Sequence, residues 1–494
     1  MSDVQTLSTR AVRGLPWIAA EKWISRLLTL LVFVILGRIL PPSEFGLIAL
    51  ATALTTIIGV FVEYGLAQSI VQRSEMTKAD IWTAFWTSVV GSVLLYGVVL
   101  ALTPVLVAVY DEPELSSIVP VLGLVLPIAG LASVPAALLE RELKFKPLAI
   151  RQLGGAFTGA AVAIVLALTG AGIWALVFQP VVVAFVGTVI LWAAARWVPR
   201  FTYSLASLKS MWAFSLQVVL IELMNALQSN VDKFIVGIFF SATELGFYFM
   251  AQRILTIVME VVASVLAKIS LPTLSRLQHD QSRFLSYFYT LTFGSAVIAF
   301  PIFGLLIGFG SEITTFLFGS GWDASVPLMM LMAPSAMLAS VTFFDRSVLL
   351  AKGRGAASLS VASGQFAFGT VVLLAAVPFG LATVAAGRTI RQVAYWPVRI
   401  AALRRYGGVS AGSYLARFVA PTVATVGLVG VAWGLGLTGW ADAPVPIVTF
   451  VLPAALICLA VYGGLVFLLG RRDLKAIYSV IRRSFGRSKS AVEE

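Results

Sequence analysis

Charged side chains interrupt the long apolar runs of this 494-residue sequence. If those runs cross a bilayer, a central charge costs roughly 2.5–3.5 kcal/mol on insertion scales, so it is expected to face a bundle interior or a watery cavity. Four of the charged residues, Arg26, Arg38, Asp345 and Arg346, lie near the ends of predicted helices and can extend to the interface instead. The others are candidates for binding or ion coupling: Glu63, Glu222, Asp232, Lys233, Arg253, Glu260, Arg388 and Arg391.

A basic stripe between residues 388 and 399 suits an anion. Arg388, Arg391, Tyr395 and Arg399 recur at helical spacing, with Gln392 beside them and no acidic residue on the same predicted helix. Guanidinium groups bind phosphate in a bidentate manner. The stripe therefore predicts a site for a pyrophosphate or an acidic sugar, held by Arg388, Arg391 and Arg399.

Two further predicted helices carry a polar face. One face holds Glu222, Asn225, Ser229, Asp232 and Lys233, and the other holds Arg253, Thr256, Glu260 and Ser264. We expect both faces and the basic stripe to line one cavity, in which Lys233 and Arg253 add to the anion site. The carboxylates are either coupling groups or members of structural ion pairs, and for Asp232 both interpretations stay open: Glu63, Glu222, Asp232 and Glu260.

The composition indicates that lipid surrounds the elements that carry these residues. The chain is 59% hydrophobic and 12% charged, with a mean hydropathy of +0.95, whereas soluble domains are about 45–50% apolar and about 25% charged. A helix needs roughly 20 apolar residues to cross the hydrocarbon. We therefore predict an all-α polytopic membrane protein with about fourteen transmembrane helices, near 17–40, 45–70, 80–109, 117–139, 147–169, 172–195, 211–240, 245–271, 286–310, 324–350, 356–377, 380–403, 415–437 and 445–469.

The loops between these helices alternate in charge. Every second connection collects Lys and Arg, and the remaining loops hold only acids: Glu44, Asp111, Glu112, Glu114, Glu244, Glu312, Asp323 and Asp442. Because Lys and Arg concentrate in cytoplasmic loops, we expect both termini to be cytoplasmic. The same rule accounts for the net charge of +12 without a nucleic-acid partner. The single His279 and single Cys458 provide no metal cluster and no intramolecular disulfide, and we expect no metal, cofactor or catalytic residue.

Two stretches of the sequence align at an offset of 200 residues. Gly37, Glu44, Gly46 and Ala51 match Gly237, Glu244, Gly246 and Ala251, which maps predicted helices 1–2 onto helices 7–8. Because six helices per unit is an even number, the units are expected to be parallel repeats. The predicted organisation is an N-terminal lobe (1–200, helices 1–6), a C-terminal lobe (201–410, helices 7–12), helices 13–14 (411–470) and a basic cytoplasmic tail (471–494).

Several motifs carry a resemblance to a known family. They are G-R-I-L-P-P-S-E-F-G at 37–46, V-P-A-A-L-L-E-R-E-L-K-F at 134–145, N-V-D-K-F-I-V-G at 230–237, E-L-G-F-Y-F-M-A-Q-R at 244–253, L-P-T-L-S-R-L-Q at 271–278 and G-S-G-W at 319–322. With these motifs in order over nearly the whole chain, the sequence resembles the polysaccharide flippases (Wzx-like, colanic-acid type) of the multidrug/oligosaccharidyl-lipid/polysaccharide exporter (MOP) superfamily.

The resemblance implies two six-helix lobes in alternating access and a bacterial inner-membrane location. It implies that undecaprenyl-pyrophosphate-linked oligosaccharide repeat units move from the cytoplasmic to the periplasmic leaflet, for lipopolysaccharide, exopolysaccharide or capsule synthesis. Expected partners are this lipid-linked oligosaccharide, membrane lipid, and a polysaccharide polymerase with its chain-length machinery.

Other function classes agree with part of the same pattern. A cation-coupled multidrug exporter or a peptidoglycan lipid-precursor flippase would share the architecture. Drug exporters of the superfamily use acidic sites in the N-terminal lobe, where the membrane acids here reduce to Glu63, which disfavours drug export. A membrane enzyme needs paired carboxylates or a metal near a long soluble loop, and the sequence shows neither.

Overall fold

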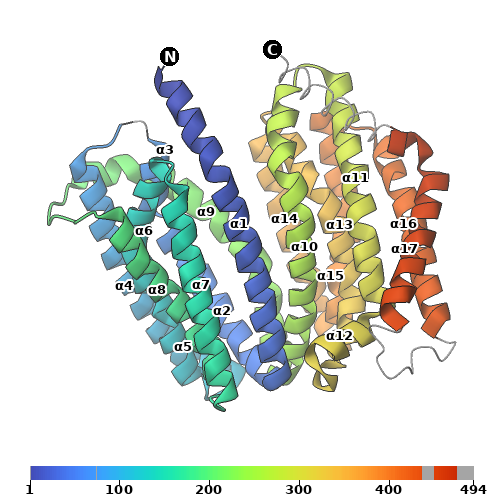
Figure 1. The fold of residues 1–494 in the computed structure, drawn as a ribbon, viewed down its shortest axis with the longest axis horizontal. Coiled ribbons are helices and arrows are strands. Elements are labelled where there is room, and N and C mark those ends of the chain that lie inside the picture. Colours follow the sequence, from blue (N-terminus) through green and yellow to red (C-terminus); the bar gives the residue numbers. More distant parts are fainter. Residues whose placement is uncertain (1, 74, 437–449, 476–494) are drawn as a thin grey trace. The chain divides into compact units, whose positions relative to one another are not determined.

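Helices make up the secondary structure of the computed structural model, which describes residues 2–73, 75–436 and 450–475 (Figure 1). The chain divides into two compact units, Met1–Phe249 and Met250–Glu494. The first unit contains α1 (Ser2–Ile39), α2 (Pro42–Glu63), α3 (Leu66–Gln72), α4 (Lys78–Tyr110), α5 (Leu115–Gly123), α6 (Val125–Arg141), α7 (Phe145–Leu168), α8 (Trp174–Ala195), α9 (Leu205–Phe239) and the start of α10 (Ala242–Arg276).

The second unit holds the rest of α10 and the helices that follow it. These are α11 (Gln281–Gly308), α12 (Gly310–Phe318), η1 (Ser320–Trp322), α13 (Ser325–Ala351), α14 (Gly355–Ala376), η2 (Val377–Phe379), α15 (Leu381–Ala402), the π-helical turn η3 (Leu403–Gly407), α16 (Ala411–Gly436) and α17 (Leu452–Leu469). Most of the predicted basic tail, Asp442, the start of the predicted helix 445–469 and the side chain of Ser264 lie outside the described residues.

The predicted spans coincide with helices over the described residues. Each of the fourteen predicted ranges overlaps one long helix or two consecutive ones. Eleven helical segments of the described chain are long and apolar enough to cross a membrane. The ranges not among these eleven correspond to α1, α10 and α15. The all-α membrane fold is therefore confirmed, and the count of fourteen crossings stays a prediction.

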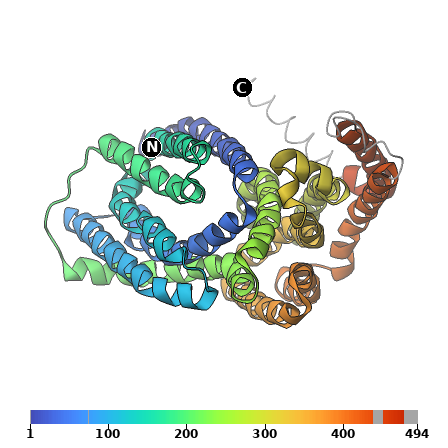
Figure 2. The same cartoon turned by 90° about the horizontal axis from the view of Figure 1, so that it is seen from below.

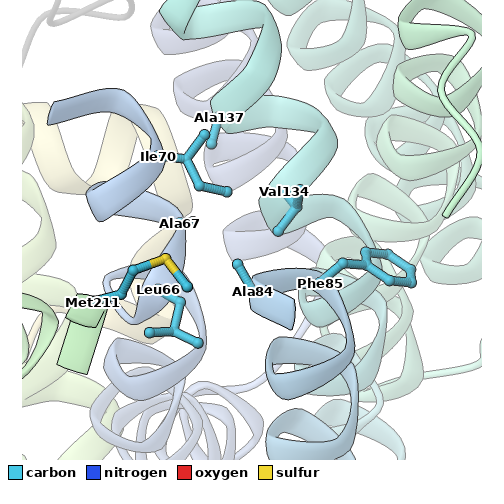
Figure 3. Close-up of a cluster of buried hydrophobic side chains, with 8 residues drawn as sticks. All are labelled: Leu66, Ala67, Ile70, Ala84, Phe85, Val134, Ala137 and Met211. Carbon is cyan, nitrogen blue, oxygen red and sulfur yellow. The ribbon is translucent and has the colours of Figure 1, made fainter. Parts of the chain in front are cut away.

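An apolar cluster fixes the interior of the first unit (Figure 3). Leu66 and Ile70 of α3 meet Phe85 of α4, Val134 of α6 and Met211 of α9. Helix α9 also packs on α2, where Val60 contacts Val219 and Ala226. The predicted lobe boundary lies before α9, at residue 200, whereas the division into compact units falls after Phe249, because α9 packs on α2 and α3 in the first unit. The functional division into lobes stays a prediction.

The 200-residue repeat has a structural counterpart within the first unit. A Cβ atom on Gly46 would overlap the carbonyl oxygen of Ala242, and a Cβ atom on Gly246 would overlap the carbonyl oxygen of Pro42. These four positions form two pairs with the same offset of 200. The starts of α2 and α10 therefore cross reciprocally, as two repeats related by a two-fold axis would, and only glycine permits the close backbone approach.

Candidate functional site

The helices of the first unit, drawn in blue to green, stand in a ring when seen along their length (Figure 2). Within this unit, four of these helices, α2, α3, α6 and α7, line a cavity of about 200 Å³. Its polar residues are Glu63, Gln68, Ser133, Glu140 and Arg151, and alanines form much of the remaining wall. We call it the polar cavity. It combines a guanidinium and two carboxylates with groups that can bind sugar hydroxyls.

A helix break positions Glu63. Helix α2 ends at Glu63 and the chain resumes as α3 at Leu66, so Tyr64 and Gly65 interrupt an otherwise continuous apolar run. A Cβ atom on Gly65 would lie 2.7 Å from the carbonyl oxygen of Phe61. This approach is closer than real Cβ contacts allow, so glycine makes the break possible. The break places the carboxyl group of Glu63 at the wall of the polar cavity, where its side chain is accessible.

Two arginines hold the short helix α3 in place. The Nη1 atom of Arg141 donates to the carbonyl oxygen of Ile70 at 2.7 Å. Arg73 donates to the carbonyl oxygen and to the hydroxyl of Ser210 on α9. The carbonyl groups at a helix C-terminus lack partners within the helix. Arg141 supplies such a partner, and Arg73 ties the end of α3 to α9. The wall that carries Gln68 is therefore fixed at its C-terminal end.

Arg151 lines the same polar cavity as Glu63. It lies in the second turn of α7, is half-buried, and attracts Glu63 electrostatically. On the other side, a Cβ atom on Gly187 of α8 would be 3.5 Å from Cγ of Arg151, an ordinary contact distance. A guanidinium held in this way can bind an anion, and the carboxylate opposite it competes for the same charge.

Sequence analysis did not select Arg151 as a site residue, because it counted Arg151 with the basic loop residues Arg141, Lys144 and Lys146. The predicted helix 147–169 already contained Arg151, and α7 begins at Phe145. Pro147 was a signal that Arg151 belongs to the helix and not to the loop. Proline fits the first turn of a helix and not its interior, so Pro147 places the helix start at or just before itself and Arg151 beyond the first turn.

The polar side chains of α9 form hydrogen bonds with nearby residues of α9 and with Tyr248 of α10. The Nδ2 atom of Asn225 donates to Oε2 of Glu222 at 3.2 Å. Asp232 is buried and accepts a hydrogen bond from the hydroxyl of Tyr248 at 3.2 Å. The Nζ atom of Lys233 donates to Oδ1 of Asn230 at 2.9 Å. The Tyr248 contact leaves both interpretations of Asp232 open, and the binding roles of Glu222 and Lys233 stay predictions.

Arg399 is enclosed in a buried network of the second unit. Its guanidinium pairs with Asp345 of α13 at 3.2 Å and donates to Oε1 of Gln365 at 3.1 Å and to the carbonyl oxygen of Thr342 at 2.6 Å. The hydroxyl of Tyr414 on α16 donates to the other oxygen of Asp345 at 3.0 Å. The basic stripe has no acid on its own helix, but a neighbouring helix supplies one. This contact neutralises the charge of Arg399.

The rest of the basic stripe packs toward α14. A Cβ atom on Gly369 would lie 3.0 Å from Cδ of Arg391, and one on Gly364 would overlap the hydroxyl of Tyr395. Arg388 is half-buried on the same helix. Arg253 and Glu260 are half-buried on the part of α10 that belongs to the second unit. The predicted common cavity draws on residues of both units, so it stays a prediction.

Comparison with known proteins gives the same family as the motifs. Residues 35–327 match the family model described as polysaccharide biosynthesis protein. The chain is 25% identical over 437 residues to the teichuronic acid biosynthesis protein TuaB of Bacillus subtilis, covering 88% of this chain and 90% of TuaB. It is 27% identical over 301 residues to the succinoglycan biosynthesis transport protein ExoT of Rhizobium meliloti, covering 61% of each.

The fold resembles that of a solved flippase. The inward closed conformation of the lipid II flippase MurJ matches with a TM-score of 0.70 at 13% identity, covering 92% of this chain and 99% of that one. The resemblance to polysaccharide biosynthesis proteins is thus confirmed, and the likeness to MurJ shows a shared fold. Since the family model covers more than half of the chain, this protein belongs to the polysaccharide biosynthesis protein family.

Proposed function

We propose that this multi-pass membrane protein is a flippase for undecaprenyl-pyrophosphate-linked oligosaccharide repeat units. It carries them by alternating access from the cytoplasmic to the periplasmic leaflet of the inner membrane, for lipopolysaccharide, exopolysaccharide or capsule synthesis. It transforms no bond. A polymerase and chain-length machinery receive its product on the far side. Family membership and the similarity to ExoT, a succinoglycan biosynthesis transport protein, support this assignment.

The observation that carries the proposal is the polar cavity of the first unit. Arg151 is a permanent cation held among apolar helices, where a charge is costly unless it has a use or a partner. A pyrophosphate group offers two bidentate acceptors to a guanidinium. Sugar hydroxyls would meet Gln68, Ser133 and Glu140. The predicted residues Arg388, Arg391, Arg399, Lys233 and Arg253 would contact the head group at other stages of its passage.

Glu63 gives a physical route to coupling. When ionised, Glu63 neutralises Arg151 and competes with the anionic head group. When protonated, it releases the guanidinium for the pyrophosphate. Proton uptake would therefore favour loading, and proton loss would favour release. Glu222, Asp232 and Glu260 remain alternative coupling carboxylates.

Translocation of labelled undecaprenyl-pyrophosphate oligosaccharide in vesicles tests the function. The wild-type protein should move this lipid and should not move a cationic drug. Arg151→Ala should reduce the rate at least about tenfold, which corresponds to about 1.4 kcal/mol of lost head-group interaction. Lys144→Ala is the matched control, because Lys144 is exposed beside Glu142 before the same helix. Drug transport without lipid transport would instead favour a multidrug exporter.

Arg391→Ala tests the second unit in the same assay and in cells. We expect it to abolish surface polysaccharide while the protein remains in the membrane. Normal polymer in this variant would remove Arg391 from the mechanism without affecting the assignment of Arg151.

A further inference from the structure

The first unit contains a second pocket, which is apolar and separate from the polar cavity. Its volume is about 410 Å³, within the usual size range of ligand sites, and α2, α3, α4 and α9 line it. We call it the apolar pocket, and its walls include Phe61, Leu66, Gly91, Leu95, Trp212 and Leu216. Its polar lining consists of hydroxyl groups, two of which, on Thr87 and Ser92, donate to carbonyl groups of their own helix at 2.8 Å.

The apolar pocket lies on the surface that would meet lipid. Leu94 and Trp212, which line it from α4 and α9, have exposed fractions of 66% and 56%. Both helices are apolar enough to cross a membrane. In a bilayer the pocket would therefore exchange its contents with lipid chains and not with water.

One helix break separates the two chambers. Phe61, Val62 and Leu66 face the apolar pocket, whereas Glu63 and Ala67 face the polar cavity. The α2–α3 break therefore contributes side chains to both chambers. A single amphiphile with its charged end at the polar cavity would therefore have its apolar chain within reach of the pocket.

Basic residues surround the same end of the unit. Arg73 ends α3, Lys78 begins α4, and Lys209 lies near the start of α9. Lys78 is nine residues before Thr87, a rise of about 14 Å at 1.5 Å per residue. We call these three residues the basic rim. The basic rim carries the positive charge that would bind a diphosphate in the cytoplasmic leaflet, and the apolar pocket lies a short distance away.

From these observations we propose that the apolar pocket binds the polyprenyl tail of the cargo before the head group enters the polar cavity. This inference rests on the proposed function. The occupant is a segment of the isoprenoid chain of a diphosphate lipid, because the basic residues beside the pocket can bind the diphosphate to which that chain is attached. The site would select cargo by its tail, independently of the sugar.

Gly91 allows a sharp test by filling the pocket. A Cβ atom there would meet nothing within 4 Å, so a side chain at this position has room to begin, and Gly91→Leu should extend into the pocket. Gly97→Leu is the matched control, since Gly97 lies on the same helix, is equally open, and does not line the pocket. The full-length protein in vesicles of phosphatidylethanolamine and phosphatidylglycerol would be photolabelled with a diazirine-bearing polyprenyl diphosphate.

We expect Gly91→Leu to reduce both labelling and oligosaccharide translocation by about tenfold through lost apolar burial, and Gly97→Leu to leave them unchanged. Labelled peptides should come from α4 and α9. Equal labelling by a diazirine phosphatidylglycerol, or normal labelling of Gly91→Leu, would overturn the proposal. If Gly91→Leu transports normally while Arg151→Ala does not, the tail site fails and the flippase stands. If the wild type moves no lipid-linked oligosaccharide, the proposed function fails.

Discussion

Arg151 and Glu63 line one cavity, where two opposite charges can influence each other electrostatically. Arginine keeps its charge in proteins, so the carboxyl group of Glu63 is the partner that can change state. This asymmetry assigns anion binding to Arg151 and proton exchange to Glu63. The pair is thus more than a structural link between α2 and α7.

Glu63→Gln separates these two roles. Glutamine keeps the shape of the side chain and cannot ionise, so Arg151 should bind the pyrophosphate lipid at any pH. We expect binding to persist while the stimulation of transport by a proton gradient disappears. Binding of the lipid and uptake with and without an imposed gradient would be measured in the same vesicles. A variant that still responds fully to the gradient would exclude Glu63 and direct attention to Glu222 or Glu260.

The buried pair of Asp345 and Arg399 makes a different prediction. Removing one partner of a buried ion pair typically costs about 3–5 kcal/mol, because the other charge is left without compensation. Asp345→Ala should therefore lower the thermal stability of the detergent-solubilised protein strongly, and Asp345→Leu combined with Arg399→Leu should recover much of it. An Asp345→Ala protein as stable as the wild type would show that Arg399 does not depend on this pair.

At the level of elements, the crossing of α2 and α10 depends on two glycines. A methyl group on either one meets a backbone carbonyl, which cannot move aside as a side chain would. Gly46→Ala and Gly246→Ala should each destabilise the protein by about 1–3 kcal/mol, the usual cost of overpacking. Because both substitutions push the same two helices apart, the double variant should lose less stability than the sum of the losses of the two single variants. Thermal unfolding measures this, with Gly97→Ala as the control in open space. Additive effects would contradict a shared crossing.

The sequence predicted the helices well and the interruptions poorly. Long apolar runs determine where a chain can cross a bilayer, so the predicted ranges coincide with the helices. The predicted helix 45–70 instead divides at Tyr64 and Gly65, and 117–139 divides at Leu124. Hydropathy does not register such breaks, because packing against neighbouring helices decides them. Hydropathy also does not predict which side chains meet. Arg151 lies near the start of α7, beside the basic loop, and Asp345 contacts Arg399 from 54 positions away in the sequence.

At the scale of the whole molecule, the alternation of loop charge predicts which side of the membrane each turn faces. An even number of crossings puts both termini in the cytoplasm, the acidic turns outside and the basic turns inside. The single cysteine makes this measurable, since Cys458 can be replaced to give a cysteine-free background. New cysteines would then be placed at four exposed positions. Glu114 and Ala324 lie in acidic turns that are predicted to face outside, and Lys144 and Arg354 lie in basic turns that are predicted to face the cytoplasm.

A membrane-impermeant maleimide added to intact spheroplasts should label Glu114→Cys and Ala324→Cys and leave Lys144→Cys and Arg354→Cys unmodified until the membrane is opened. Each compact unit contributes one outer and one inner position, so the orientation of both is tested at once. The orientation also decides the direction of transport, because the α2–α3 break and its basic rim must face the leaflet in which the cargo is made. Labelling of Lys144→Cys from outside would show that the first unit has the opposite orientation in the membrane. The polar cavity would then open away from its substrate, and the flippase direction proposed above would be wrong.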